Sequence, residues 1–291
     1  MIEARGLRKE YGDFVAVEDA SFTVDPGEVL GVIGPNGAGK TTTLKMLAGL
    51  VEPTAGEATV AGIPAGDSEM RHRLGFLPEE SPLYEEMTAE SYLHFFADLY
   101  EVPSGVADRR FHDALSNLDL DHRDRRIGDM SKGMKRKVAI ARSLVNDPEV
   151  LIYDEPGSGL DPLTTNYIID FTADLAEAGK TVLFSAHNLF HVESICDRVL
   201  ILNDGEIVAR GDLASLREEY GDTRYHVHTS VSVPGSERRN GAYVRVVESM
   251  DAVERTRAAA DDAGGRVIDI RTEESSLEEV FLDVADASAE A

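Results

Sequence analysis

The sequence predicts an α/β protein with a mainly parallel sheet, followed by a small α+β appendage. Continuous apolar runs at 150–153 and 181–185 are typical of strands that are buried on both faces of a sheet. Helical patterns separate the predicted strands, and that order of elements builds parallel sheets. A break in the pattern near 215–225 indicates a second, smaller domain.

The first part of the chain opens with a short strand and a helix. The run 28–34 predicts a strand that enters a glycine-rich turn, and the pattern over 40–50 predicts the helix that follows. Further on, the runs 199–202 and 206–209 flank Asn203-Asp204-Gly205, which is typical of a β-hairpin turn.

The chain divides into two predicted domains, at residues 1–218 and 222–291. The first contains a helical subdomain over about 84–145, whose aromatic side chains we interpret as core. In the second, the predicted elements are strands over 225–233 and 243–247, a helix over 252–263, a strand over 266–270 and a helix over 276–284. We expect a loop at 234–241 and a loose tail over the last six residues.

The charge and composition disfavour several kinds of partner and site. Asp and Glu number 54 against 29 Lys and Arg, for a net charge of −25, and both nucleic acid and anionic lipid need basic contacts. The single cysteine, Cys196, excludes an internal disulfide framework and a cysteine-built metal site. We expect no signal peptide and no membrane-spanning segment, because no apolar run is long enough.

The basic residues are mostly arginine, with 22 Arg and seven Lys. We interpret the excess of carboxylates as adaptation to a salt-rich cytoplasm, that of a halophile, because at molar salt the Debye length is about 3 Å and self-repulsion is screened. The alternative is an ordinary acidic protein from a GC-rich genome, since such genomes also favour Arg over Lys.

A glycine-rich loop between a predicted strand and a predicted helix fits the pattern G-x-x-x-x-G-K-[ST]. Its residues are Gly34, Pro35, Asn36, Gly37, Ala38, Gly39, Lys40 and Thr41, with Thr42 following. The glycines let backbone N–H groups turn toward phosphate oxygens, and the helix N-terminus directs its positive end at them. Lys40 adds a charge for the β- and γ-phosphates, and the Thr41 hydroxyl is placed to bind Mg²⁺.

Two carboxylates, Asp154 and Glu155, directly follow the apolar run 150–153. The carboxyl ends of parallel strands lie at the crevice where α/β proteins bind ligands. We predict that Asp154 holds the Mg²⁺ shell and that Glu155 accepts a proton from an attacking water.

With these motifs, residues 2–215 resemble the ATP-binding subunit of ABC transporters. The segment Met130–Met134, MSKGM, stands where that family has its LSGGQ signature, and Ser158–Asp161 matches the loop that crosses its dimer. Tyr11 and His187 stand at the positions of its adenine-stacking aromatic residue and its switch histidine. Residues 131–142 hold three Lys, two Arg and no acid, which we interpret as a surface that faces ATP.

The resemblance implies roles for four of these residues. Tyr11 stacks on adenine, and Ser131 and Gly133 cap the γ-phosphate of ATP held by the opposite subunit. His187 bonds the γ-phosphate and holds the attacking water near Glu155. The alternatives are structural, with Tyr11 packed in an edge strand and His187 a structural histidine.

The chain departs from the family pattern in three ways. Lys132 and Met134 replace glycine and glutamine in the signature, a variant found in the branch that exports drugs, sodium and antibiotics, and the ending 276–282 resembles that branch too. Glu79 stands where the family has glutamine, so it offers an oxygen to Mg²⁺ or its water but as an anion. Gly157 replaces a threonine and predicts a looser turn.

The resemblance therefore implies an ATPase that binds ATP and Mg²⁺, forms an ATP-sandwich dimer and energises a separate transmembrane permease. It implies a cytoplasmic location, peripheral on the inner face of the cell membrane. The resemblance to the exporter branch favours export over import. We expect the Glu79 loop and the aromatic-rich helices after Tyr84 to contact the permease. The alternatives are a soluble ABC-type ATPase acting on ribosomes or DNA, and a generic phosphate-loop kinase or GTPase. The single cassette and the acidity disfavour the first, and the order of the motifs disfavours the second.

Overall fold

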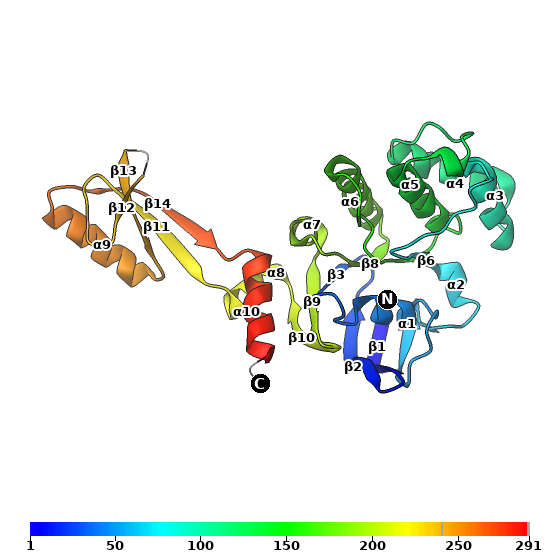
Figure 1. Cartoon of the computed structure of the whole chain (residues 1–291), viewed down its shortest axis with the longest axis horizontal. Helices are drawn as coiled ribbons and strands as arrows, with labels where there is room; N and C mark the ends of the chain where they lie inside the picture. Colours follow the sequence, from blue (N-terminus) through cyan, green and yellow to red (C-terminus); the bar gives the residue numbers. More distant parts are fainter. Residues whose placement is uncertain (240, 290–291) are drawn as a thin grey trace. The chain divides into compact units, whose positions relative to one another are not determined.

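The computed structural model describes residues 1–239 and 241–289, and it divides into two compact units, Met1–Asp212 and Leu213–Ala291. The division falls before residue 218, the predicted end of the first domain. Helix α8 (Leu213–Tyr220) therefore belongs to the second unit rather than to the first. Figure 1 shows the elements of both units.

The first unit is built on one ten-stranded sheet with the order β5-β4-β1-β2-β10-β9-β3-β8-β7-β6. Its parallel part consists of β9 (Arg198–Asn203), β3 (Val29–Ile33), β8 (Thr181–Ser185), β7 (Val150–Tyr153) and β6 (Leu74–Leu77). The mainly antiparallel part consists of β1 (Ile2–Tyr11), β2 (Phe14–Val24), β4 (Ala55–Val60), β5 (Ile63–Pro64) and β10 (Glu206–Gly211). Every residue of β3, β7 and β8 is buried, so the predicted fold class is confirmed.

Three helices pack on one another within the range 84–145: α3 (Ala89–Leu99), α4 (Ser104–Asn117) and α5 (Lys132–Ser143), with a short 3₁₀ turn at Ile127–Asp129 (Figure 1). Polar residues cap two of them, because Thr88 accepts the N–H of Ser91 and Ser131 accepts that of Met134. The expectation that the aromatic residues here are core is only partly right. Tyr92 is buried, whereas Tyr84 and Phe95 are 56% and 39% exposed.

The other helices of this unit are α1 (Lys40–Leu47), α2 (Met70–Arg73), α6 (Pro162–Glu177) and α7 (Leu189–Ile195). Helix α1 ends three residues before Leu50, the predicted end of the helix. Gly49 has φ +66°, and a Cβ there would lie 2.4 Å from the backbone nitrogen of Gly66. Gly49 N–H donates to Met46 O and Leu50 N–H donates to Lys45 O, the arrangement by which a left-handed glycine ends a helix.

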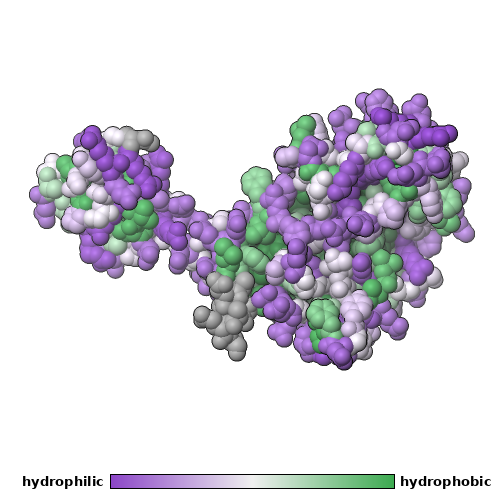
Figure 2. All heavy atoms as spheres, viewed as in Figure 1, coloured by the Kyte–Doolittle hydropathy of each residue, from purple (hydrophilic) through white to green (hydrophobic). Residues whose placement is uncertain are grey.

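A large hydrophobic core of the first unit includes side chains of the sheet and of α1. It is made of fully buried aliphatic side chains, among them Leu7, Leu30, Leu44, Val150, Leu183 and Leu200. The visible surface is largely hydrophilic (Figure 2), as the acidic composition requires. No helix in the described ranges is long and apolar enough to cross a membrane.

The second unit holds a four-stranded antiparallel sheet with the order β12-β13-β11-β14 and two helices besides α8. Its elements are β11 (Thr223–Thr229), β12 (Glu237–Arg239), β13 (Ala242–Val247), α9 (Met250–Asp262), β14 (Val267–Glu274) and α10 (Leu277–Ala289). Val227, Val247 and Val253 form its core between the sheet and α9.

Two predictions for this unit are wrong. The segment 234–241 contains strand β12, because Glu237–Arg239 pairs with β13; Asn240 lies outside the described residues. The predicted tail is helical as far as Ala289, since α10 continues through it without a break. Its last two residues lie outside the described part of the chain.

Candidate phosphate site

The glycine-rich loop connects β3 to α1 and surrounds one side of a cavity of about 320 Å³. The left-handed backbone at Gly39 (φ +96°) passes so close to β2 that a Cβ would lie 2.5 Å from the carbonyl oxygen of Ala16. Lys40 Nζ donates to the carbonyl oxygens of Gly34 at 2.7 Å and Pro35 at 3.1 Å. The residues that line the cavity are Phe14, Ala16, Asn36, Gly37, Ala38, Gly39, Lys40, Thr41, Thr42, Glu79, Glu155 and His187.

Asp154 and Glu155 stand at the carboxyl end of β7, and both are buried, at 1% and 6% exposure. Ser185, the last residue of β8, lies between them. Its hydroxyl donates to Asp154 Oδ1 at 2.7 Å and accepts the backbone N–H of Glu155 at 3.0 Å. Glu155 has φ +47°, a conformation uncommon for a residue with a side chain.

Two carboxylate oxygens at this place lack a hydrogen-bond partner. Over residues 1–239 and 241–289, Asp154 Oδ2 and Glu155 Oε1 are the buried side-chain polar atoms left without one. Buried charged oxygens are normally paired, so each unpaired one indicates a ligand or a reaction. Hard carboxylate and hydroxyl oxygens are the protein ligands that Mg²⁺ prefers, and Asp154 and Thr41 supply them. The residues present therefore fit a magnesium ion.

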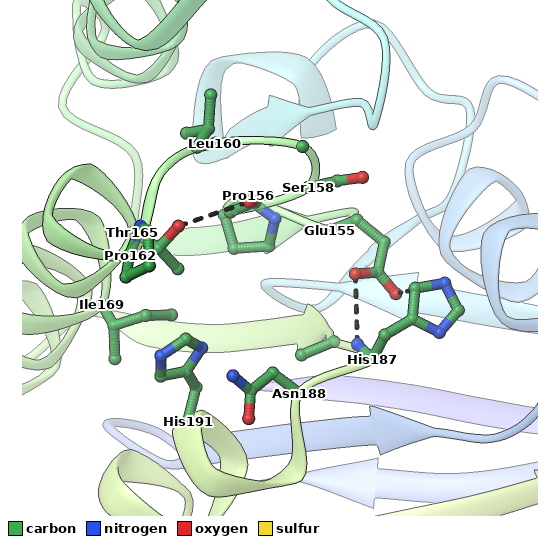
Figure 3. A pocket seen from close by; sticks show the side chains of 13 residues that line it. Glu155, Pro156, Ser158, Leu160, Pro162, Thr165, Ile169, His187, Asn188 and His191 are labelled. Atoms are coloured by element: carbon green, nitrogen blue, oxygen red, sulfur yellow. Dashed lines mark hydrogen bonds and ion pairs between the residues drawn. The ribbon is translucent and has the colours of Figure 1, made fainter.

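Glu155 and His187 lie together, although 32 positions separate them in the sequence. The backbone N–H of His187 donates to Glu155 Oε2 at 3.2 Å, and His187 Nε2 lies 3.4 Å from Glu155 Oε1 (Figure 3). Both residues also line a second cavity of about 370 Å³, together with the loop 156–160 and His191. Burial raises the pKa of the Glu155 carboxyl, and His187 and Lys40 oppose that rise. A carboxylate with a raised pKa is suited to accept a proton.

The electrostatic partner of these carboxylates is Lys40. Burial lowers the pKa of its ammonium group, and the neighbouring charges of Glu155, Asp154 and Glu79 oppose that fall. Three carboxylates and one ammonium thus face one another, which leaves the cluster short of positive charge. A magnesium ion would make up that deficit.

Tyr11 and Phe14 flank the turn between β1 and β2, where their backbones pair directly. Phe14 lines the phosphate-loop cavity and Tyr11 does not. Tyr11 is 50% exposed, and Lys9 Nζ lies 5.2 Å from the centre of its ring. Tyr11 is therefore an exposed hairpin residue rather than one packed in the fold, and Phe14 is a second aromatic candidate for adenine stacking.

Ser131 and Gly133 begin helix α5 and do not line the phosphate-loop cavity of the same chain. Ser131 Oγ accepts the N–H of Met134 at 3.2 Å. Within the basic segment predicted to face ATP, Arg136 and Lys137 are buried and donate to backbone carbonyl oxygens of their own chain. Burial lowers the pKa of the Arg136 guanidinium to about 10, against the opposing charge of Asp154.

The turn at Gly157 is tighter than predicted. A Cβ at this position would lie 2.5 Å from Thr165 Cγ2, so the side chain of α6 occupies the space that a threonine would need. Asp161 then caps α6 by accepting the N–H of Thr164 at 3.0 Å. The loop 157–161 is thus fixed at both ends.

Sequence reasoning missed three residues of this region. Ser185 ends an apolar run as a lone polar residue, and that pattern is a usable signal. The only sequence signal for Phe14 is its position three residues after Tyr11. Arg136 gave no signal, because a buried arginine looks like any other basic residue of its segment.

The comparisons with known proteins agree with this geometry. The ABC transporter family matches residues 17–158. An uncharacterized ABC transporter ATP-binding protein of Nostoc sp. is 41% identical over 73% of this chain and 64% of its own length. The ABC transporter ATP-binding protein NatA of Bacillus subtilis is 42% identical over 70% of this chain and 84% of its own length. The linearmycin resistance ATP-binding protein LnrL of the same species is 37% identical over 76% and 72%.

Solved structures agree as well. An ATP-binding subunit of an ABC transporter has a TM-score of 0.70 and 34% identity, covering 76% of this chain and 93% of that chain. A dimeric ATP-binding cassette in a post-hydrolysis state, bound to ADP and Pi, has a TM-score of 0.67 and 26% identity over 73% and 99%.

The sheet, the phosphate loop and the paired carboxylates define a nucleotide-binding ATPase of the phosphate-loop class. The relatives narrow that class. The chain belongs to the ATP-binding proteins of ABC transporters.

Proposed function

We propose that this chain is the ATP-hydrolysing subunit of an ABC exporter and drives a separate membrane permease from the cytoplasmic face. The observation that carries the proposal is the pair of unpartnered buried oxygens, Asp154 Oδ2 and Glu155 Oε1, beside Lys40 and the phosphate loop. Neither oxygen accepts a hydrogen bond within the described residues. Bound Mg²⁺ and a triphosphate with its attacking water would supply their partners.

The phosphate loop and the polar side chains beside it then have distinct chemical tasks. The backbone N–H groups of the phosphate loop and Lys40 bind the β- and γ-phosphates. Thr41 and Asp154 hold Mg²⁺, which neutralises charge on the phosphate oxygens when bound. Glu155 accepts a proton from the attacking water while the water oxygen forms a bond to the γ-phosphorus. The bond between that phosphorus and the bridging oxygen breaks, and ADP leaves. His187 orients the water from its place beside Glu155.

Two copies complete each other's sites in this proposal. Ser131 and Gly133 lie outside the cavity of their own chain, and the N-terminus of α5 is suited to hold a phosphate from a second chain. A solved relative is described as a dimeric cassette bound to ADP and Pi, which supports the assembly of two copies.

The permease contact is proposed on helix α3 and the segment before it. Tyr84, Phe95 and Leu99 are 56%, 39% and 60% exposed, and exposed apolar clusters mark interaction surfaces. Export is supported by relatives named for linearmycin resistance and, in Burkholderia lata, for Nod factor export.

Affinity purification from membranes of the source cell tests the proposed permease contact. The wild type should retain a protein with several membrane spans, and a Phe95→Glu, Leu99→Glu variant should lose it while keeping its ATPase rate.

The Glu155→Gln variant tests the catalytic assignment. It should bind ATP, release phosphate at least 100-fold more slowly and accumulate as a dimer in size-exclusion chromatography with ATP and Mg²⁺. Glu149→Gln is the matched control, because Glu149 directly precedes the first residue of β7, at the end away from the site, and pairs with Arg73. The ATPase rate of this variant should stay within twofold of the wild type. Normal hydrolysis by Glu155→Gln would show that Glu155 is not the base.

A further inference from the structure

Arg136 is a charged side chain buried at 8% exposure in the second turn of α5. Its five guanidinium N–H groups are shared among six acceptors, and five of these are backbone carbonyl oxygens. The acceptors are Pro156 O at 2.8 Å, Asp154 O at 3.0 Å, Glu155 O at 2.8 Å, Pro78 O at 2.7 Å, Glu79 O at 2.9 Å and Ser81 Oγ at 3.4 Å. None is a carboxylate oxygen, so the group does not serve as half of an ion pair.

These acceptors belong to two segments only. One segment, 78–81, follows β6, and the other, 154–156, follows β7, its parallel neighbour in the sheet. Each segment sends one carboxylate to the phosphate-loop cavity, Glu79 from the first and Glu155 from the second. A single guanidinium thus joins the backbones that carry both carboxylates.

The contact matters most at Glu155, because its backbone is left-handed, with φ +47°. Such a conformation persists in a residue with a side chain only where its surroundings hold it. Ser185 Oγ holds the N–H of Glu155 and Arg136 Nη2 holds its carbonyl oxygen. The two bonds lie on either side of the strained residue and fix the direction of its side chain.

We propose that Arg136 is a positioning residue, which sets the backbone of Glu155 for proton transfer and couples it to the segment 78–81. This inference rests on the proposed function, because it gives Arg136 a part in hydrolysis by Glu155. The planar fork of arginine is essential to it. A lysine ammonium at the same place keeps the charge, but its three donors radiate from one atom and cannot reach both segments.

The first experiment separates turnover from binding. In Arg136→Lys and Arg136→Gln, kcat for ATP hydrolysis should fall at least tenfold, while the Kd for a fluorescent ATP analogue stays within twofold of the wild type. Lys137→Gln is the matched control: Lys137 is equally buried on the same helix, but its ammonium donates to Asp119 O at 3.2 Å, away from the site. Its kcat should stay within twofold of the wild type. In Arg136→Ala, millimolar ethylguanidinium should restore at least a third of the lost rate, and in Lys137→Ala it should have no effect.

The second experiment follows the coupling. The chain contains no tryptophan, so a Tyr84→Trp substitution introduces a single fluorescent reporter just after the segment 78–81. Addition of ATP and Mg²⁺ should change the emission of this tryptophan when Arg136 is present. In the Arg136→Gln background the change in emission should be at most a fifth as large.

Three results would overturn the proposal. One is a kcat for Arg136→Gln within twofold of the wild type. The second is a parallel loss of ATP binding and of cooperative unfolding without guanidinium rescue, which would make Arg136 a purely structural residue. The third is a reporter that responds equally in both backgrounds. Failure of the proposed function looks different, because the wild type itself would then not hydrolyse ATP.

Discussion

Ser185 and Asp154 are joined by a 2.7 Å hydrogen bond from the Ser185 hydroxyl to Asp154 Oδ1. Ser185 ends β8 and Asp154 directly follows β7, its parallel neighbour, so the sheet itself fixes their separation. The bond uses one carboxylate oxygen and leaves the other, Oδ2, for a ligand. It therefore decides which way the metal-binding oxygen points.

Ser185→Ala should lower kcat for ATP hydrolysis about 10- to 100-fold, because a hydrogen bond to a charged group contributes about 1.5–3 kcal/mol. The apparent affinity for Mg²⁺ should fall with it, since Asp154 loses its fixed orientation. Steady-state hydrolysis across a magnesium titration measures both. Ser143→Ala serves as the control, because Ser143 is also buried but bonds Tyr153 Oη, outside the cavity. Equal effects of the two substitutions would contradict the assignment.

Glu155→Gln should make the folded protein more stable at neutral pH. The pKa of Glu155 is raised in the folded state, so the folded state binds the proton more tightly than the unfolded one. Its charge therefore costs stability above the folded pKa, and this cost disappears as the pH falls below the ordinary value of 4.5. The gain in the free energy of unfolding should be present at pH 7 and absent near pH 4.

Urea titrations at the two pH values measure this gain. Glu57→Gln is the control, since its side chain is 74% exposed, and its effect should not differ between them. A Glu155→Gln variant that gains no more at pH 7 than at pH 4 would contradict the burial argument.

The adenine-stacking residue can be identified by comparing two alanine variants. Stacking of a base on an aromatic ring contributes about 1–3 kcal/mol, so the correct substitution should raise the Kd for ATP roughly tenfold. Because Phe14 lines the cavity, Phe14→Ala should weaken binding more than Tyr11→Ala. Phe14→Tyr should bind like the wild type. If only Tyr11→Ala weakens binding, the original assignment from the sequence is right.

Salt should stabilise the folded chain. With a net charge of −25, the folded state suffers self-repulsion that is screened when the Debye length falls from about 10 Å at 0.1 M salt to about 3 Å at 1 M. The urea midpoint should therefore rise between 0.1 M and 2 M KCl. A flat or falling midpoint favours the alternative of an ordinary acidic protein from a GC-rich genome.

Much of the phosphate site could be predicted because its signals are local. The loop 34–41 and the pair Asp154-Glu155 each lie within a few residues of a buried strand, and parallel strands bring their ends to one edge. Ser131 and Gly133 were placed by resemblance, and the start of α5 is where the structure has them.

What could not be predicted depends on contacts distant in sequence. Arg136 meets Pro78 across 58 positions, and no pattern within its own helix records that contact. The tightness at Gly157 depends on the methyl group of Thr165, which belongs to the next helix. Whether Tyr11 or Phe14 meets the cavity depends on how their hairpin twists, and residue type alone does not show it.

The unpartnered oxygens of Asp154 and Glu155 also bear on how this chain tolerates engineering. Replacing either carboxylate by its amide removes a buried negative charge, so a selection for heat resistance alone would favour such changes. Those same changes would abolish turnover, because the lost charges are the ones that hold the metal and take the proton. At Asp154 and Glu155, substitutions that raise thermal stability would therefore lower catalytic activity. Consensus or stability-guided redesign should leave these two positions untouched.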